Sequence, residues 1–375
     1  MRPLRVLVVD DSALNRRTLA DLLSQMPGVT VAGVAQDGDE ALRLAAQLAP
    51  DLITLDLEMP RMDGFTFLRL LMATRPTPVL VVSSHSAKEN VFRALELGAI
   101  DFIAKPDSFI TSHAESVRQQ LDSMVAMVRQ LAPAKNLRRS VAPRPRESHR
   151  PPQAAAQRGG APDAGGGKRR PPSRLMVIAS STGGPTALLD LFSQLPAQSD
   201  ACVVVAQHMP ERFTRAFAER LDRMSSFSVK EASDGDSLYA EQAVVCPGGK
   251  CVEVDFLNGR VLLHVVEPDA RDRYTPSGDR LFRSAARALG ERVIGVVLTG
   301  MGEDGARGVI DIKNAAGTVF VESEETAVVY GMPRCANATG AVDEVLPLPG
   351  LVTRLSGLIA RSADAASNEN RGGHT

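Results

Sequence analysis

The stretch Arg5-Val6-Leu7-Val8-Val9-Asp10-Asp11 places two carboxylates directly after a short apolar run near the start of the chain. A short apolar run is typical of a buried strand, and in doubly wound sheets chemical groups gather at the carboxyl ends of strands. Helical patterns separate this run from four more apolar runs: 30–34, 52–55, 79–82 and 101–104. Five strand–helix units of this kind predict an α/β domain with a parallel, doubly wound sheet.

The same alternation returns in the second half of the chain. Three apolar runs are each followed by a helical pattern: 175–179, 202–206 and 293–298. Three denser runs lie between the last two of these: 243–246, 252–256 and 261–266. Asn258-Gly259, which separates two of the denser runs, is a strong hairpin signal. We therefore expect a second doubly wound parallel-sheet domain with an antiparallel hairpin excursion.

Residues 132–173 break this pattern, with eight prolines, two glycine runs, ten basic and two acidic residues. Such a segment cannot bury enough apolar surface to offset the entropy of ordering it, so we predict a disordered linker. Its positive charge would suit contact with nucleic acid, although a solvated linker is the simpler interpretation. The predicted boundaries are a first domain at 1–131, a second domain at 174–360 and a polar tail at 361–375.

The composition argues against several classes of protein. Basic and acidic residues number 43 and 44, and tryptophan is absent, which disfavours a nucleic-acid partner. The four cysteines form no C-x-x-C pair, so we expect free thiols. No apolar stretch approaches the ~18 residues of a membrane span, and the first apolar run is too short for a secretory signal. We expect a cytoplasmic protein without membrane insertion.

Polar residues follow four of the predicted strands in the first domain: Asp10 with Asp11, then Asp56, Ser83 and Lys105. Each alone would be an ordinary loop residue, but the carboxyl ends of parallel strands meet at one edge of the sheet. Three converging carboxylates suit Mg²⁺. A lysine ammonium can neutralise a transferred phosphoryl group, and a hydroxyl can hydrogen-bond it. The pattern therefore predicts a magnesium-dependent phosphoryl site.

The first domain, from about residue 5 to 131, resembles a response-regulator receiver domain. The motifs are Val8-Val9-Asp10-Asp11-Ser12, Leu55-Asp56-Leu57-Glu58-Met59-Pro60-Arg61-Met62-Asp63-Gly64 and Lys105-Pro106. The resemblance implies that Asp56 is the phosphoacceptor and that Asp10, Asp11 and Asp56 organise Mg²⁺. It places Ser83 and Phe102 at the switch positions and Lys105 at the family's lysine.

Three strand ends of the second domain carry the residue types of a nucleophilic hydrolase. Ser181 begins Ser181-Thr182-Gly183-Gly184-Pro185, which predicts a tight turn into a helix whose free N–H groups stabilise an oxyanion. Of the six histidines, only His208 follows a predicted parallel strand of this domain. Asp304 follows the run at 293–298. Together these residues are typical of a nucleophile, a base and an orienting acid.

Two alternatives compete with the hydrolase interpretation. Gly300-Met301-Gly302-Glu303-Asp304-Gly305 matches the dinucleotide-binding pattern G-x-G-x-x-G, with Glu322 near the next strand end. Its two carboxylates would face the pyrophosphate at a helix N-terminus, which disfavours this alternative. The other alternative is a receiver joined to a non-enzymatic output domain that binds a partner or nucleic acid.

The second domain, from about residue 174 to 360, resembles the catalytic domain of the chemotaxis protein-glutamate methylesterase family. The resemblance rests on four blocks: Ala179-Ser180-Ser181-Thr182-Gly183-Gly184, Gln207-His208-Met209-Pro210, Leu298-Thr299-Gly300-Met301-Gly302-Glu303-Asp304-Gly305 and Tyr330-Gly331-Met332-Pro333. It implies Ser181 as nucleophile, His208 as base and Asp304 as its partner. Turn support and oxyanion stabilisation then fall to Thr182, Gly183, Gly184 and Met301. Ser180 stands where the family more often has glycine, and we choose Ser181 because it directly precedes Thr-Gly-Gly.

A receiver followed by this catalytic domain is the architecture of that family. The resemblance implies a phosphorylation-activated serine hydrolase that demethylates glutamate methyl esters on methyl-accepting chemoreceptors and deamidates receptor glutamines during chemotaxis adaptation. Mg²⁺ would serve receiver phosphorylation, and the esterase reaction would need no cofactor. The implied partners are the chemotaxis histidine kinase, as phosphodonor, and the chemoreceptors, as substrate.

Overall fold

The computed structural model describes residues 2–83, 88–105, several positions between 118 and 129, and residues 170–360. The chain divides into two compact units, Met1–Glu147 and Ser148–Thr375, and each is described by itself. Most of the predicted linker and all of the predicted tail lie outside the described residues.

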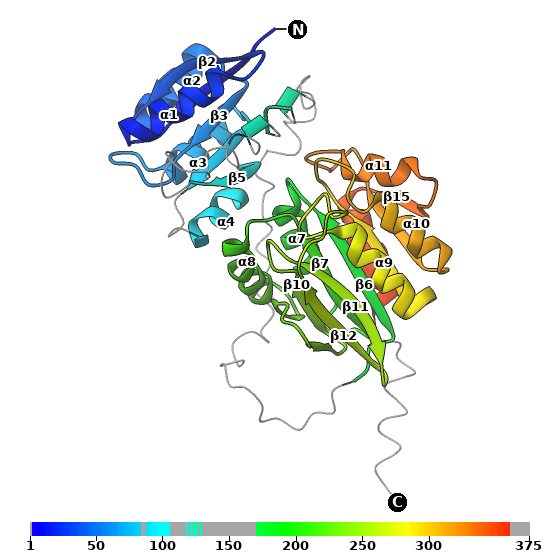
Figure 1. The fold of residues 1–375 in the computed structure, drawn as a ribbon. Helices are drawn as coiled ribbons and strands as arrows, with labels where there is room; N and C mark the ends of the chain where they lie inside the picture. Colours follow the sequence, from blue (N-terminus) through cyan, green and yellow to red (C-terminus); the bar gives the residue numbers. More distant parts are fainter. Residues whose placement is uncertain are drawn as a thin grey trace, which may run out of the picture. The chain divides into compact units, whose positions relative to one another are not determined.

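Five parallel strands form the sheet of the first unit, in the order β2-β1-β3-β4-β5 (Figure 1). The strands are β1 (Leu4–Val9), β2 (Val29–Ala35), β3 (Leu52–Leu55), β4 (Val79–Ser83) and β5 (Asp101–Ala104). The helices are α1 (Ala13–Ser24), α2 (Gly38–Leu48), α3 (Gly64–Thr74) and α4 (Lys88–Glu96). Every residue of β3 and β4 is buried, which is why these strands are continuous apolar runs in the sequence. The predicted doubly wound sheet is confirmed.

Seven parallel strands form the main sheet of the second unit, in the order β15-β14-β13-β6-β7-β10-β8. The strands are β6 (Arg174–Ser180), β7 (Ala201–Gln207), β8 (Ser228–Glu231), β10 (Gln242–Val245), β13 (Val293–Val297), β14 (Thr318–Glu322) and β15 (Glu344–Leu346). The helices are α7 (Gly184–Phe192), α8 (Glu211–Met224), α9 (Gly278–Leu289), α10 (Ala306–Asn314), α11 (Met332–Ala338), α12 (Leu348–Ile359) and the short 3₁₀ helix η2 (Gly290–Arg292). The carboxyl ends of β6, β7 and β13 therefore meet at one edge.

The antiparallel excursion is a separate sheet of β9 (Ser237–Leu238), β11 (Cys251–Leu257) and β12 (Arg260–Val266). Asn258 and Gly259 have φ values of 52° and 75°, and this left-handed pair connects β11 to β12 as the sequence predicts. The run at 243–246 differs from the expectation, because β10 joins the main sheet in parallel with β7 and β8. Its residues Ala243, Val244 and Val245 are all at most 1% exposed, so both faces are covered, as in an interior parallel strand.

Residues 170–173 also differ from the sequence interpretation, which places them in the linker. The Arg170 guanidinium lies 2.7 Å from Asp200 and 3.1 Å from Glu241. The backbone carbonyl of Arg170 accepts a hydrogen bond from Ala240 N–H. Pro172 is buried. The described structure of the second unit therefore starts a few residues before β6, where an arginine of the basic segment pairs with two carboxylates of the folded unit.

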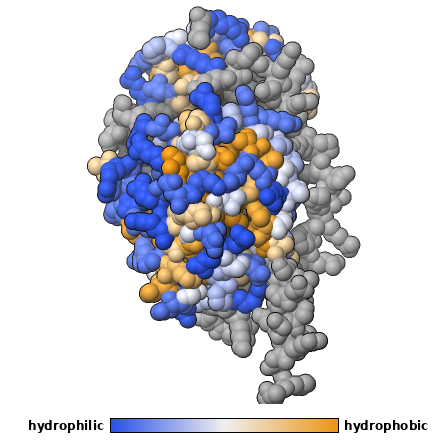
Figure 2. Space-filling view, turned by 90° about the vertical axis from the view of Figure 1, so that its right-hand side faces the viewer, coloured by the Kyte–Doolittle hydropathy of each residue, from blue (hydrophilic) through white to orange (hydrophobic). Residues whose placement is uncertain are grey.

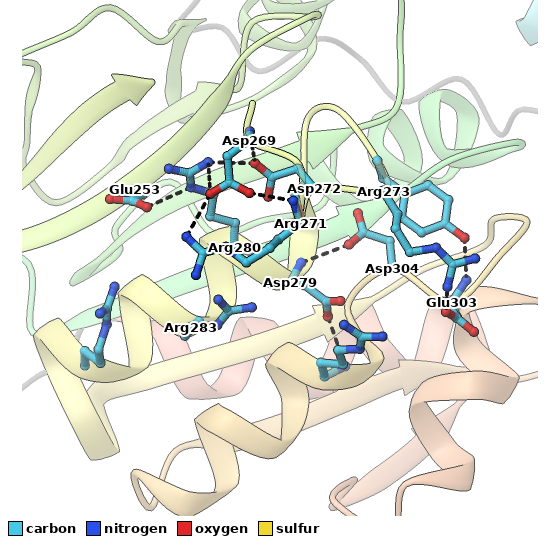
Figure 3. A pocket seen from close by; sticks show the side chains of 14 residues that line it. Glu253, Asp269, Arg271, Asp272, Arg273, Asp279, Arg280, Arg283, Glu303 and Asp304 are labelled. Carbon is cyan, nitrogen blue, oxygen red and sulfur yellow. Dashed lines mark hydrogen bonds and ion pairs between the residues drawn. The ribbon is translucent and has the colours of Figure 1, made fainter. Parts of the chain in front are cut away.

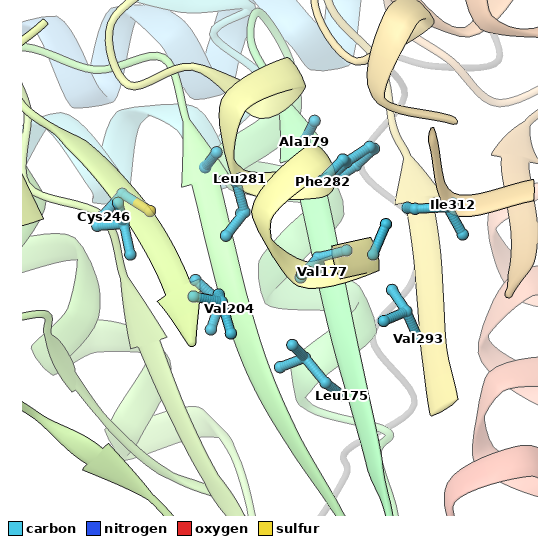
Figure 4. Packing of buried hydrophobic residues seen from close by; sticks show 14 of the residues in the cluster. Leu175, Val177, Ala179, Val204, Cys246, Leu281, Phe282, Val293 and Ile312 are labelled. Carbon is cyan, nitrogen blue, oxygen red and sulfur yellow. The ribbon is translucent and has the colours of Figure 1, made fainter. Parts of the chain in front are cut away.

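Helix α9 contacts both β6 of the main sheet and β11 of the hairpin, so it lies between the two sheets. Leu281 and Phe282 of α9 are fully buried with Val177 of β6 in one hydrophobic cluster (Figure 4). Gly308 of α10 allows this packing, since a Cβ there would lie 2.5 Å from Phe282 Cβ. Packing on three sides fixes the N-terminus of α9, which reaches the candidate site.

The surface combines hydrophilic and hydrophobic residues, and Figure 2 shows both kinds interspersed on one face. The largest exposed apolar side chains of the second unit include Leu257, Ile310 and Val345, which lie on different elements. Scattered apolar side chains of this kind are normal for a folded domain. Among the described residues, no helix is both long and apolar enough to cross a membrane.

Candidate functional site

The first unit brings Asp10, Asp11 and Asp56 together at the carboxyl edge of its sheet. Each offers a carboxylate oxygen within 4.8 Å of the others. Lys105, at the end of β5, hydrogen-bonds Asp56, and its Nζ lies 2.8 Å from Asp10 Oδ2. Three clustered carboxylates are the hard oxygen donors that Mg²⁺ prefers, so the residues fit the predicted ion.

Burial sets the electrostatics of this acidic edge. Asp10 is fully buried, and burial raises the pKa of its carboxyl despite the opposing effect of Lys105. Burial opposes the charge of Lys105, but the two carboxylates outweigh it and raise the pKa of its ammonium. A divalent cation would offset the cost of holding two buried carboxylates side by side.

The other predicted receiver residues lie on the two strands that follow β3 in the sheet order. Ser83 ends β4 and Phe102 lies on β5, and both are buried. The Phe102 ring packs edge-on against Phe92 of α4, with centroids 6.4 Å apart. Gly64 lies against the backbone of Asp56 and Leu57, because a Cβ there would be 2.4 Å from Asp56 O. Pro106 lies outside the described residues.

In the second unit, the structure separates the two adjacent serines. Ser180 is fully buried at the end of β6, and its hydroxyl donates to Gln207 Oε1 at 2.7 Å. Ser181 is partly exposed, and its N–H donates to Thr299 O at 3.0 Å. Of the two serines, Ser181 is therefore the one with solvent access, which favours it over Ser180 as nucleophile.

Gln207 ties the serine turn to the histidine loop. Its Nε2 donates to the carbonyls of Ser181 and His208, each at 2.9 Å. Gly184 makes room for it, because a Cβ there would lie 2.1 Å from Gln207 Oε1. Gln207 lies in the motif around His208, but its residue type and position alone did not indicate this role.

Thr182 and Met301 carry the backbone N–H groups of the predicted oxyanion site. Among the described residues, no acceptor is recorded for the N–H of Thr182 or of Met301. Gly183 has a φ of 77° and is the N-cap of α7, and so turns the chain sharply after Thr182. A Cβ on Gly300 would lie 2.8 Å from Ser181 Cβ, so the loop carrying Met301 passes close to the serine. Unpaired N–H groups beside a nucleophile suit an oxyanion.

His208 and Asp304 meet as predicted. His208 Nε2 lies 2.7 Å from Asp304 Oδ2, which leaves Nδ1 as the nitrogen able to accept a proton. Gly278 N–H donates to Asp304 at 2.7 Å and Asp279 N–H at 3.0 Å, so the carboxylate caps α9. Burial of Asp304 opposes its ionisation, but the bonds from His208 and these N–H groups lower its pKa below the usual value. No hydrogen bond between Ser181 Oγ and His208 is recorded among the described residues.

Sequence reasoning missed Tyr274. Its ring stacks on the His208 imidazole, with centroids 5.1 Å apart and an interplanar angle of 6°. Glu303 N–H donates to the Tyr274 hydroxyl at 3.3 Å. Tyr274 lies in an irregular segment without hydrophobic periodicity, so only its place as one of three tyrosines, just before Pro276, could have drawn attention to it.

A cavity of ≈390 Å³ borders Asp304 and Tyr274 (Figure 3). Arginine and acidic side chains dominate its lining, and several pair with one another. Arg280 lies 2.6 Å from Asp272 and 2.7 Å from Glu253. The pair with Asp272 attaches the segment before α9 to the helix, and the pair with Glu253 attaches the helix to β11 of the hairpin.

The glycine-rich loop is not arranged as a dinucleotide site. Asp304 is turned toward His208 and the N-terminus of α9. Glu322 is 1% exposed and accepts hydrogen bonds from Thr299 N–H and the Thr326 hydroxyl, so it is a structural carboxylate. The alternative has no support in this geometry.

The comparisons with known proteins agree with both halves of the chain. The family described as CheB methylesterase matches residues 176–355, and the response regulator receiver domain matches residues 6–114. The crystal structure of the Thermotoga maritima CheB methylesterase catalytic domain is 38% identical, with a TM-score of 0.48, and covers 49% of this chain and 98% of that one.

Curated relatives match along nearly their whole length. Protein-glutamate methylesterase/protein-glutamine glutaminase 3 of Geobacter sulfurreducens is 47% identical over 93% of this chain and 95% of its own. Protein-glutamate methylesterase/protein-glutamine glutaminase 6 of Anaeromyxobacter dehalogenans is 50% identical over 94% of this chain and 95% of its own. Identity at this level over both units shows that the chain belongs to the CheB methylesterase family that carries a response regulator receiver domain.

Proposed function

We propose that this chain is a serine hydrolase that removes methyl esters from glutamate side chains of chemoreceptors, and that phosphorylation of its receiver activates it. The relatives are named for methylesterase and glutaminase activities, which supports both reactions for this member of the family. The observation that carries the proposal is the 2.7 Å contact of His208 with Asp304 on the loops that flank the accessible Ser181.

Ester cleavage follows from the groups that the chain supplies. Ser181 Oγ attacks the ester carbonyl carbon while His208 Nδ1 takes the hydroxyl proton, and Asp304 stabilises the imidazolium through Nε2. The tetrahedral oxyanion accepts hydrogen bonds from the N–H groups of Thr182 and Met301. The C–O bond to methoxide then breaks, and the imidazolium returns the proton to release methanol.

The second half of the reaction restores the enzyme. His208 deprotonates a water that attacks the acyl carbonyl, and the bond to Ser181 Oγ breaks as the imidazolium returns the proton to the serine. The product is a glutamate carboxyl group, which ionises at neutral pH. A glutamine side chain gives the same acyl-enzyme with ammonia as leaving group, so one site serves both activities.

The receiver supplies the regulation in this proposal. Asp56 accepts a phosphoryl group from a histidine kinase, and bound Mg²⁺ supplies charge neutralisation at Asp10, Asp11 and Asp56. Lys105, which already contacts Asp56, hydrogen-bonds the phosphoryl oxygens. Ser83 and Phe102 on the adjoining strands respond to the new charge and shift the unit between two states.

Methanol release from methylated receptor membranes tests the esterase directly. The Ser181→Ala chain should release methanol several orders of magnitude more slowly than wild type, because the nucleophile is gone. Ser180→Ala is the matched control and should keep most of the activity, since its hydroxyl is buried against Gln207. Loss in Ser180→Ala with near-wild-type turnover in Ser181→Ala would move the nucleophile by one residue. A wild-type chain without methanol release would instead favour a non-enzymatic output domain.

A further inference from the structure

The imidazole of His208 is held by two different kinds of contact. Asp304 fixes one point of the ring through a hydrogen bond to Nε2. The Tyr274 ring covers one face of the imidazole at a nearly parallel angle of 6°. The His208 side chain is 15% exposed, so its other surroundings leave part of it open.

One hydrogen bond does not fix the plane of a ring. An imidazole held only at Nε2 can still tilt or turn about the line to Asp304, which would change the direction in which Nδ1 points. A flat surface parallel to the ring removes this freedom, because tilting then opens a gap or makes a clash. The stacked ring also presents its negative π face to the imidazolium that forms during attack.

Tyr274 is itself well held. Its hydroxyl accepts a hydrogen bond from Glu303 N–H at 3.3 Å, directly beside Asp304 in the sequence. Gly302 leaves space for this contact, since a Cβ there would lie 2.5 Å from the Tyr274 hydroxyl oxygen. Arg273 pairs with Glu303, and Arg280 pairs with Asp272 just before the tyrosine. The ion pairs beside the cavity thus fix the segment that carries the ring.

We propose that Tyr274 is a positioning residue that fixes the plane of the His208 imidazole and keeps Nδ1 directed toward Ser181. The inference rests on the proposed serine hydrolase mechanism and adds a residue to it. The ring provides the effect, and the hydroxyl serves to seat the ring against the loop of Glu303. Misplacement of a catalytic group by about 1 Å can cost about 10²-fold in rate, which sets the expected size of the effect.

The test compares Tyr274→Phe, which keeps the ring, with Tyr274→Leu and Tyr274→Ala, which remove it. Tyr239→Leu is the matched control, because Tyr239 is another partly exposed tyrosine outside the catalytic groups. Steady-state methanol release gives kcat and KM for each full-length chain, and circular dichroism confirms that it is folded. NMR of histidine-labelled protein follows the proton between His208 and Asp304 and the imidazole tautomer.

We expect kcat to fall about 10²-fold in Tyr274→Leu and Tyr274→Ala with KM nearly unchanged, and to stay within about threefold of wild type in Tyr274→Phe and Tyr239→Leu. The resonance of the His208–Asp304 proton should persist in every variant, because Asp304 still holds Nε2 when the Tyr274 ring is gone. A wild-type kcat in folded ring-less chains, or an equal loss of kcat in Tyr274→Phe, would each overturn the proposal. Because Tyr274 is partly exposed in an irregular segment, at least one of the two truncations should fold.

Failure of the proposed function gives a different result. Ser181→Ala would then release methanol as fast as wild type, whatever the Tyr274 variants do. Loss of activity in Ser181→Ala together with full activity in Tyr274→Leu would refute only the role of the tyrosine.

Discussion

At the scale of single residues, Asp304 shows how a buried carboxylate is kept ionised. Its side chain is 1% exposed, yet His208 and two N–H groups of α9 donate hydrogen bonds to it. Water could not supply this arrangement, because it would reorient as charge moved to the imidazole. Fixed donors hold the charge in place before the reaction begins.

The lowered pKa of Asp304 makes the stability of the second unit depend on pH. The unfolded chain binds this proton more tightly than the folded chain, so the ionised group stabilises the fold above the usual pKa of about 3.9. This contribution is lost as the pH falls through the lower pKa of the folded state. We therefore expect the free energy of unfolding to fall less steeply below about pH 4 in Asp304→Asn than in wild type. Urea denaturation at a series of pH values measures the free energy of unfolding of both chains. If that free energy fell equally steeply with pH in wild type and in Asp304→Asn, the account would be contradicted.

Asp10 presents the opposite case, since burial raises the pKa of its carboxyl. Its charge therefore costs stability at neutral pH, and that cost disappears as the pH falls through the raised pKa. Without Mg²⁺, Asp10→Asn should unfold at a higher temperature than wild type. The substitution removes the cost of burying the Asp10 charge, and Asp56 remains as the buried carboxylate that pairs with Lys105.

Added Mg²⁺ should reverse this order. Binding to the three carboxylates should stabilise wild type by about 2.7 kcal/mol when the ion is at about 100 times its Kd, and should barely affect Asp10→Asn. Thermal unfolding of the full chain with and without the ion decides the matter. A Mg²⁺ response in Asp10→Asn as large as in wild type would remove Asp10 from the proposed ligand set.

The sequence alone was sufficient to predict that His208 and Asp304 meet. Both follow strands of one parallel sheet, and the geometry of such a sheet brings those ends together. Tyr274 and the N–H groups of Gly278 and Asp279 could not be predicted in this way. Tyr274 reaches the site from the irregular segment before α9, and the two N–H groups come from the first turn of α9. The position of α9 depends on its packing between two sheets and not on the strand order.

At the scale of elements, α9 links the core to the candidate site, and its contact with α10 can be tested. In Gly308→Ala the new methyl group would lie 2.5 Å from Phe282 Cβ, so the helices must move apart. We expect a loss of about 1–3 kcal/mol in the free energy of unfolding. Gly357→Ala in α12 is the matched control: its Cβ meets nothing within 4 Å, and it should be neutral or stabilise by up to about 1 kcal/mol. Chemical denaturation that ranks the two variants in the opposite order would contradict the described packing.

Apolar periodicity predicted most of the strands but not the sheet to which each belongs. The run that forms β10 precedes two hairpin strands in the sequence and shares their apolar character, yet it pairs with β7 and β8. In a strand buried on both faces every residue is apolar, whereas in a strand buried on one face every second residue is polar. In a run as short as β10, that difference gives too few positions to decide.

At the scale of the whole molecule, the chain combines the proposed phosphoacceptor Asp56 in one unit with the proposed nucleophile Ser181 in the other. Arg170 holds the start of the second unit to Asp200 and Glu241, so a separate catalytic fragment should begin at residue 170 and not at 174. We further propose that phosphorylation activates the esterase by relieving a restraint that the unphosphorylated receiver places on it. The fragment 170–375 should then be more active on receptors than the unphosphorylated full chain.

The most direct measurement is the rate of methanol release from methylated receptor membranes by the full chain, with and without a phosphodonor and Mg²⁺. Wild type should be slow alone and accelerate on phosphorylation toward the rate of the 170–375 fragment. Asp56→Asn should stay at the slow rate under both conditions, and Ser181→Ala should release almost no methanol under either. A wild-type rate that does not respond to the phosphodonor, or an Asp56→Asn chain that responds as wild type does, would contradict the account.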